Sequence, residues 1–387
     1  MGVTSSALNC ICFACPWGPT SVARYLHVFL FILMAIVAFS WTFLSGSIQA
    51  PTFDNVTNEL TVQSQYFGPW IVMLAVVVYH LSLSLLLIGV HSSRDRRALI
   101  QNGMWPVKVI ALLLICLLLF ALPPPVALFK YAFYVAGLAS IAFLALQSVY
   151  LVDFAYRGAE LLVERYEESE GDIWKYSLFG ITGLLYTLGV FMTVVILIYN
   201  PNLLLVGMGN LIIMIVISIS SILEEVQEAN PQAGIFQAAF ISFYNSFLLC
   251  SSSAHEQSAL RRHVTGWETA VNVVSCLLFG LGLVYYATTI EQASDSDVEN
   301  DLNTDEEQND YCYSMSLFHL YLALAACFVV LSLTNWRQVI PNGNGKFVIG
   351  DVSERWCKWS PIVASWLLSG LYMFSLFAPL IFPDRQF

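Results

Sequence analysis

Residues 176–199 read YSLFGITGLLYTLGVFMTVVILIY, an apolar run without a single charged side chain. A helix of roughly 20 residues crosses the ~30 Å hydrocarbon core of a bilayer, so this run is long enough to span a membrane. Nine further stretches share its length and apolar character: Tyr25–Leu44, Trp70–Val90, Trp105–Leu122, Lys130–Asp153, Leu203–Leu223, Ala233–Cys250, Thr269–Ile290, Ser314–Thr334 and Ile362–Ile381. The sequence therefore predicts an all-α polytopic membrane protein with ten transmembrane helices.

The composition agrees with this class. Of the 387 residues, 58% are hydrophobic and 11% are charged, so the spans leave little chain for a soluble domain. The net charge of −11 gives no reason to expect a nucleic-acid partner. Function is therefore expected within the bilayer or at its surfaces.

One predicted helix is unusually long. No proline occurs between Pro125 and Pro201, and the pattern from Phe129 to Glu168 is typical of continuous helix. About 40 residues at 1.5 Å each make a rod of about 60 Å, twice the thickness of the hydrocarbon core. Such a rod must tilt or protrude along the inner surface, and it is placed to join two helical bundles.

The positive charges of the early loops set the orientation. Residues 45–69 lack Lys and Arg and carry a glycosylation sequon at Asn55, so this loop should face the lumen or exterior. The next connection contains Arg94, Arg96 and Arg97, which is typical of a cytoplasmic loop. Ten spans then leave both termini in the cytosol, although the later loops carry positive charge on the opposite side.

Both the N-terminus and one late loop carry interaction signals. Acylation candidates at the N-terminus are Cys10, Cys12 and Cys15. Nine acidic residues and no Lys or Arg lie between Glu291 and Asp310. This composition is typical of a solvated cytoplasmic loop, and the alternative is a docking site for a trafficking adaptor.

No motif indicates an enzyme. The six histidines show no metal-ligand spacing, and the chain has no phosphate-binding glycine loop and no nucleophile elbow. We therefore expect no catalytic residues, no metal and no cofactor.

Polar groups inside the spans are the remaining candidates, because burying them in lipid is costly. Asp153 and Arg157 share a helical face, either as an interfacial ion pair or as a site for the two charges of a zwitterionic lipid headgroup. Lys108 either snorkels to the inner surface or contacts a headgroup phosphate. Ser220 and Gln237 complete the candidate headgroup residues. Further residues that would line a polar furrow are Ser218, Ser221, Asn245, Asn272 and His319.

A series of short motifs then runs in order along the chain: His91-Ser92-Ser93-Arg94-Asp95, Asn102-Gly103 with Trp105 and Lys108, Val152-Asp153-Phe154-Ala155, Gln227-Glu228 with Pro231, Ser316-Leu317-Phe318-His319, Leu333-Thr334-Asn335-Trp336 and Ala378-Pro379-Leu380. Each motif is weak alone, but their order, spacing and coverage are specific. In these motifs the sequence resembles the serine incorporator (SERINC) family of eukaryotic membrane proteins.

The resemblance implies ten spans in two bundles crossed by a long diagonal helix. The corresponding segments are a cytoplasmic Cys-containing N-terminus (1–24), three spans (25–128), the diagonal helix (129–170), spans five to eight (171–290), an acidic cytoplasmic loop (291–312), and spans nine and ten with a short tail (313–387). It also implies residence in Golgi, endosomal or plasma membranes and binding of phospholipids and sphingolipids.

The leading functional hypothesis is scramblase-like, energy-independent movement of phospholipids, linked to the distribution of phosphatidylserine and sphingolipids. One alternative is a scaffold for enzymes that incorporate serine into lipids. The other is a serine or solute carrier, which favours broken helices, with Gly207 and Gly209 as the only hint of a break.

Overall fold

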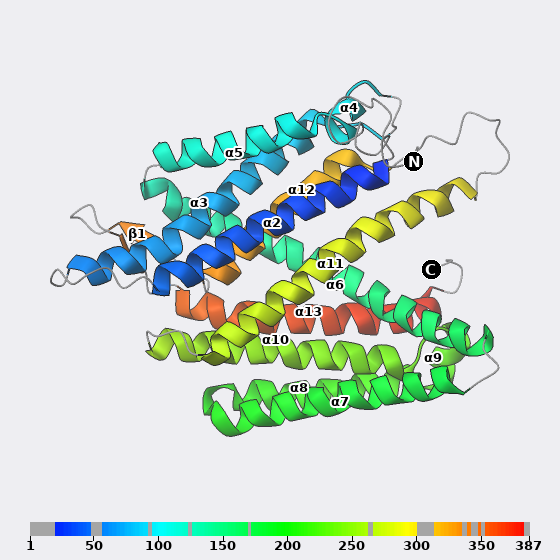
Figure 1. The fold of residues 1–387 in the computed structure, drawn as a ribbon. Helices are drawn as coiled ribbons and strands as arrows, with labels where there is room; N and C mark the ends of the chain where they lie inside the picture. The colour runs from blue at the N-terminus through cyan, green and yellow to red at the C-terminus, as the bar shows by residue number, and fades with distance from the viewer. Residues whose placement is uncertain are drawn as a thin grey trace. The chain divides into compact units, whose positions relative to one another are not determined.

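The structure is a computed structural model (Figure 1). It describes residues 20–47, 56–91, 95–122, 126–168, 172–261, 266–299, 313–334, 339–341, 347–349 and 353–382. The predicted acylation sites Cys10, Cys12 and Cys15 and the glycosylation candidate Asn55 lie outside these residues.

The described chain is almost entirely helical. The elements are α2 (Thr20–Ser47), α3 (Val56–Leu86), α4 (Ala98–Asn102), α5 (Trp105–Ala121), α6 (Val126–Glu168), α7 (Ile173–Tyr199), η1 (Pro201–Leu203), α8 (Leu204–Ser221), α9 (Glu224–Ala229), α10 (Ile235–Arg261), α11 (Gly266–Glu299), α12 (Met315–Leu333), β1 (Val339–Pro341), β2 (Phe347–Ile349) and α13 (Ser353–Ile381). The two strands form a short antiparallel hairpin in which Ile340 pairs with Val348.

The helices sort into two compact units. Unit 1 comprises residues 1–143 and 278–353, and unit 2 comprises residues 144–277 and 354–387. The boundaries fall inside α6 and α11, so each of these helices contributes one part to each unit. α6 spans 43 residues without interruption, which confirms the predicted long helix.

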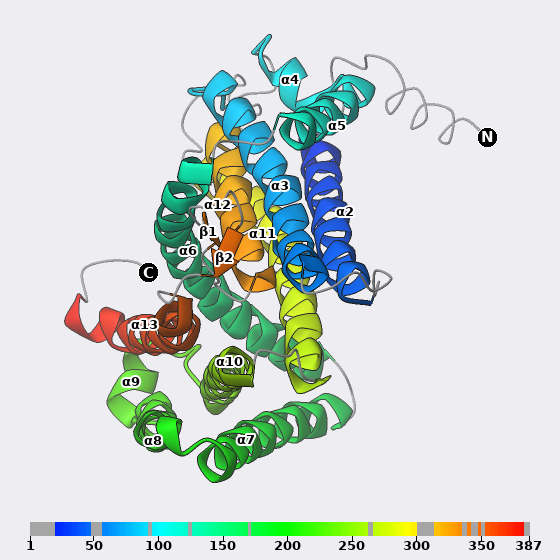
Figure 2. The same cartoon turned by 90° about the vertical axis from the view of Figure 1, so that its left-hand side faces the viewer.

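Unit 1 is built around α3, which packs against α2, α5 and α12 (Figure 2). Its interior contains an aromatic group in which the ring of Phe143 lies 5.3 Å from that of Phe328 and 5.6 Å from that of Phe279. Ser84 on α3 and Ser316 on α12 each donate a hydrogen bond to the other's carbonyl oxygen, at 2.9 and 2.8 Å. This reciprocal pair fixes the register of the two helices.

Unit 2 is built around α10, which packs against α7 and α8. A small residue permits the approach of α7, because a Cβ at Gly189 would lie only 3.3 Å from Cα of Phe243. The apolar core of this unit includes Ala155, Ile217, Ile241 and Tyr372.

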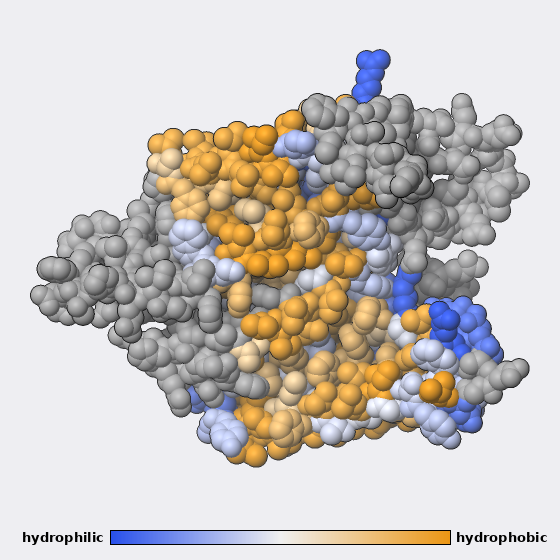
Figure 3. All heavy atoms as spheres, viewed as in Figure 1, coloured by the Kyte–Doolittle hydropathy of each residue, from blue (hydrophilic) through white to orange (hydrophobic). Residues whose placement is uncertain are grey.

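The surface and helix lengths establish the class. Within the described residues, eight helical stretches are long and apolar enough to cross a membrane, and shorter apolar helices occupy Trp105–Ala121 and Val273–Thr289. Apolar side chains cover most of the described surface on the face that Figure 3 shows, and Leu205 is 86% exposed. The polytopic all-α class is confirmed, whereas the count of ten spans stays a prediction.

One sequence-based expectation needs correction. The segment 291–312 was expected to be a loop, but α11 continues through its first nine residues to Glu299. This part of the segment contains no proline or glycine, so nothing in its backbone chemistry ends the helix. Gly207 and Gly209, the only hint of a helix break under the solute-carrier alternative, lie inside α8, which runs unbroken through both.

Candidate functional site

A buried polar cluster lies inside unit 1. Five helical elements contribute to it: His27 comes from α2, His80 from α3, Gln101 from α4, Lys108 from α5 and His319 from α12. All five side chains are at most 5% exposed. So many polar groups within apolar helices are costly unless they bind one another or a ligand.

The connection between α3 and α5 positions the two cluster residues that α4 and α5 contribute. Arg97 donates a hydrogen bond to the carbonyl of Ile88 at 2.9 Å, and its backbone N–H donates to the carboxylate of Asp95 at 2.8 Å. The hydrogen bonds that the backbone N–H and then the guanidinium of Arg97 donate to this carboxylate lower the pKa of Asp95. The connection ends at Met104, whose φ of 58° is left-handed, a conformation that costs free energy in a residue with a side chain. This turn starts α5 with Lys108 one turn inside the helix.

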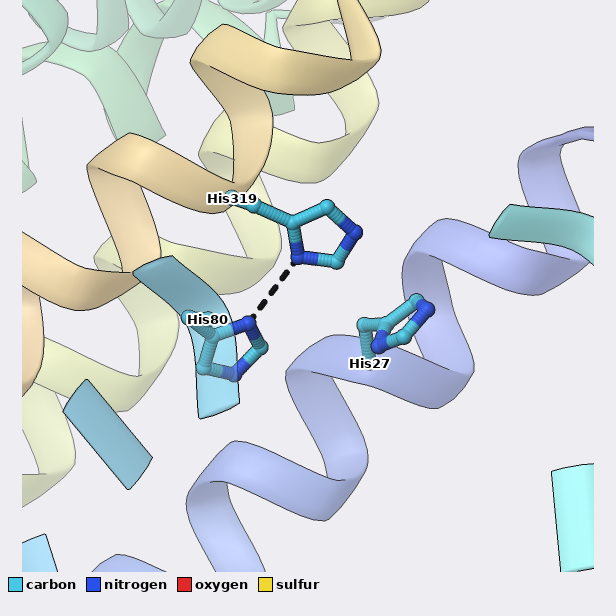
Figure 4. Close-up of side chains that lie close together, drawn as sticks. All are labelled: His27, His80 and His319. Carbon is cyan, nitrogen blue, oxygen red and sulfur yellow. Dashed lines mark hydrogen bonds between the residues drawn. The ribbon is translucent and has the colours of Figure 1, made fainter. Parts of the chain in front are cut away.

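A hydrogen-bonded chain runs through the cluster. Gln101 Nε2 donates to the hydroxyl of Tyr313 at 3.1 Å, so Gln101 Oε1 is free to accept from His319 Nε2 at 2.6 Å. His319 then carries its proton on Nε2 and has a lone pair on Nδ1. The Nδ1 atom of His80 lies 2.9 Å from His319 Nδ1 and donates a hydrogen bond to its lone pair (Figure 4).

Lys108 is held by neutral groups. Its Nζ donates to the carbonyl of Gln101 at 2.6 Å and to His27 Nε2 at 3.3 Å, and it lies 3.9 Å from the ring centroid of Trp105. In the described part of the chain none of its contacts is with a carboxylate. A second cationic group, Arg24, lies over the ring of Tyr313 at 4.9 Å.

Several polar atoms of this region lack a hydrogen-bond partner. Within the described residues these include His27 Nδ1, Asn102 Oδ1 and the hydroxyl of Tyr79, all of them buried. Buried unpaired polar atoms are rare in native proteins and often indicate an unseen water or ion.

Unit 2 contains a different polar group, and its members bind one another. Asn210 on α8 donates to Thr193 Oγ1 at 3.0 Å and to Ser246 Oγ at 3.1 Å, which joins α7, α8 and α10. Asn245 donates to Ser369 Oγ at 2.8 Å, which joins α10 to α13. This pattern is typical of polar contacts that hold membrane helices together.

The ion pair of α6 is arranged differently, because it lies at the surface. Arg157 Nε contacts both carboxylate oxygens of Asp153, at 3.1 and 3.2 Å. The two side chains are 41% and 36% exposed. The exposed neighbours on the N-terminal side of the pair are apolar and include Val149, whereas on its C-terminal side both Leu161 and the charged Glu160 are exposed. The pair thus lies where the exposed surface of α6 changes from apolar to charged.

The predicted site residues fall into three groups. Lys108 and His319 belong to the buried cluster of unit 1. Unit 2 contains the others, of which Asp153 and Arg157 are partly exposed, while Ser220, Ser221, Gln237 and Asn245 are buried. Ser218 bonds the hydroxyl of Tyr186, and Gln237 donates to the carbonyl of Gln232 at 2.7 Å. The side chain of Asn272 lies outside the described residues. The role of each residue toward lipid stays a prediction.

Sequence reasoning missed the grouping of three histidines. His80 and His319 are 239 residues apart, so a search for ligand spacing along one segment does not find them. The available signal was that His27, His80 and His319 all lie within apolar spans, where a histidine is costly.

Comparison with known proteins identifies the family. The serine incorporator (Serinc) family matches residues 1–303 and 289–385. Bovine serine incorporator 3 is 26% identical over 99% of this chain and 96% of its own length. A probable serine incorporator of Nematostella vectensis is 27% identical over 97% and 93%, and bovine serine incorporator 2 is 29% identical over 81% and 77%. The chain belongs to the serine incorporator family.

Proposed function

We propose that this protein moves phospholipids passively between the two leaflets of a membrane, as a scramblase does. The observation that supports the proposal is the Asp153–Arg157 pair, which offers one carboxylate and one guanidinium where the apolar exposed surface of α6 meets its charged C-terminal part. A zwitterionic headgroup carries the matching phosphate and ammonium charges. Such a headgroup can exchange its water for these two side chains while its acyl tails contact the apolar surface.

The position of the pair along α6 suits this role. Asp153 lies about 33 Å along the helix axis from Tyr131, where the apolar part of the helix begins. An upright helix would place the pair at headgroup level, and a tilted one would draw it deeper into the hydrocarbon. The 38-residue span candidate is longer than one crossing needs and its last part is charged, so we infer that α6 tilts or protrudes from the bilayer.

The proposed transport runs down a concentration gradient and needs no covalent chemistry, no cofactor and no nucleotide. The names of the relatives speak of serine incorporation, so a scaffold for lipid-synthesis enzymes is the second candidate. The same proposal places the protein in Golgi, endosomal or plasma membranes. Both of its termini would lie in the cytosol.

The test uses purified protein in liposomes that carry a fluorescent phosphatidylcholine in both leaflets. A quencher added outside bleaches about half of the signal when lipids stay in their leaflet, and more when they cross. We expect bleaching to pass one half with the wild-type protein. A plateau at one half with folded protein would remove the transport proposal and favour the scaffold, and uptake of labelled serine by the same vesicles tests a carrier.

A matched pair of variants tests the ion pair itself. Asp153→Asn with Arg157→Gln should slow lipid movement about fivefold, since an ion pair of this exposure contributes up to ~1 kcal/mol. The control is Arg165→Gln with Glu168→Gln, which removes a second pair on α6 that is 3.9 Å apart and lies among charged residues. Equal rates of lipid movement in the two double variants would show that the Asp153–Arg157 pair has no specific role in moving lipid.

A further inference from the structure

We propose that His27, His80 and His319 bind a divalent transition metal of the Zn²⁺ class and thereby tie α2, α3 and α12 together. Each histidine offers a ring nitrogen, and these three nitrogens all lie within 4.8 Å of one another. The three side chains are at most 1% exposed. Figure 4 shows the three rings turned toward a common space between their helices.

The distances suit a metal after small adjustments. Zn–N bonds of about 2.0–2.1 Å in a tetrahedral site place two ligand nitrogens roughly 3.3 Å apart. His80 Nδ1 and His319 Nδ1 are 2.9 Å apart, so this pair must open by about 0.4 Å, and His80 must move its ring proton from Nδ1 to Nε2 so that both Nδ1 atoms offer a lone pair. No two of the three ligand nitrogens are more than 4.8 Å apart. A pair at that distance must approach by about 1.5 Å, which rotation of an imidazole ring supplies.

The hydrogen bonds around His319 prepare it as a ligand. Metal-binding histidines usually donate their second N–H to a carbonyl or carboxylate, which fixes the tautomer. His319 Nε2 donates to Gln101 Oε1, and Gln101 is itself oriented by its bond to Tyr313. The Nδ1 lone pair of His319 therefore points at His80 rather than at solvent.

His27 supplies an independent indication of a missing ligand. Its Nδ1 is buried and has no hydrogen-bond partner, although its ring lies 4.7 Å from that of His319 at nearly a right angle. Once the ring proton of His27 moves to Nε2, a metal bound at Nδ1, with a water as its fourth ligand, would give Nδ1 the partner that it lacks.

The chemistry of the donors selects the metal. Neutral imidazoles suit Zn²⁺, Cu²⁺ and Ni²⁺, whereas Mg²⁺ and Ca²⁺ prefer oxygen ligands. The Lys108 ammonium, 3.3 Å from His27 Nε2, repels any cation at this place. Replacing it by Met should therefore tighten metal binding, which is the reverse of what a phosphate-binding site would show.

The experiment measures metal uptake by untagged full-length protein that has been stripped with chelator in detergent. Mass spectrometry counts Zn²⁺ after dialysis, and Co²⁺ reports ligand geometry through its visible absorption bands. We expect one equivalent of Zn²⁺ per chain, the intense bands of tetrahedral Co²⁺, and at least a tenfold weaker affinity in His80→Gln. The matched control is His91→Gln, which removes a histidine outside the cluster and should bind like the wild type.

A measurement on the wild-type protein guards against variants that do not fold. X-ray absorption at the zinc edge should show scattering from about three imidazoles. Uptake below about 0.1 equivalent, equal uptake by His80→Gln and the wild type, or an absorption spectrum of oxygen or sulfur ligands would each overturn the proposal. The cluster would then be a hydrogen-bonded network only.

Discussion

Gln101 is the residue through which the buried cluster is connected, so its replacement by Leu is the most informative perturbation. The side chain takes part in two buried hydrogen bonds, one with Tyr313 and one with His319. Leu has nearly the same volume but can make neither bond. Gln101→Leu therefore leaves the Nε2–H of His319 without its acceptor and removes one hydrogen bond of the Tyr313 hydroxyl.

The magnitude follows from these two bonds. Side-chain hydrogen bonds in membrane proteins contribute about 0.6 kcal/mol on average and at most about 1.7 kcal/mol. Buried groups without a partner cost about 1–3 kcal/mol each in soluble proteins. We expect Gln101→Leu to lower the free energy of unfolding by about 1–3 kcal/mol. Lys108 should keep its bond to residue 101, because that bond is with the backbone carbonyl.

Equilibrium unfolding in mixed micelles, followed by tryptophan fluorescence, measures the effect, and a double-mutant cycle assigns it. His319→Phe removes the other partner, and the double variant should be about 1 kcal/mol more stable than the sum of the single changes predicts. Gln232→Leu makes the same substitution at an exposed turn and should change stability by less than about 0.5 kcal/mol. Additive effects of Gln101→Leu and His319→Phe would refute the hydrogen-bonded chain.

Three more substitutions test other parts of the structure. Gly189→Val should lower the unfolding temperature by forcing α7 away from Phe243, whereas Gly180→Val on the same helix, where a Cβ meets open space, should not. Asn210→Leu should cost only about 1 kcal/mol in the same unfolding assay, because Thr193 and Ser246 keep their bonds to the carbonyls of Gly189 and Ser242. The pKa of Asp95 is lowered in the folded protein, so its stabilising effect is present above the ordinary value of about 3.9 and is lost as the pH falls through the lower folded value. Asp95→Asn should therefore speed amide exchange in α4 at pH 7, and a variant that exchanges like the wild type would contradict this role.

The sequence predicted the helices well because length and apolar character are local properties. The long helix was foreseen from the absence of proline between Pro125 and Pro201, and its observed start at Val126 follows directly after Pro125. The end of α11 was missed, because an acidic composition suggests a loop while the local chain contains nothing that stops a helix.

The site was predicted residue by residue but not as a group. Lys108 and His319 were both named as candidates, yet nothing in one sequence indicates that Gln101 lies between them. Their contacts join α4, α5 and α12, and helix packing of this kind leaves no spacing signal along the chain. Asp153 and Arg157 were predicted as a pair because they are four residues apart on one helix, which is a local relation.

The exposure of the side chains distinguishes the proposed lipid site on α6 from the proposed metal site in unit 1. A lipid headgroup must reach the side chains that bind it, and Asp153 and Arg157 are 36% and 41% exposed. Lys108 and the three histidines are at most 5% exposed, so in this conformation a metal ion with a water fits them far better than a headgroup does. Loss of metal binding in His80→Gln with unchanged lipid movement would show that the cluster acts on the stability of unit 1. Loss of both would require that the order of α2, α3 and α12 also controls access of lipid to the protein.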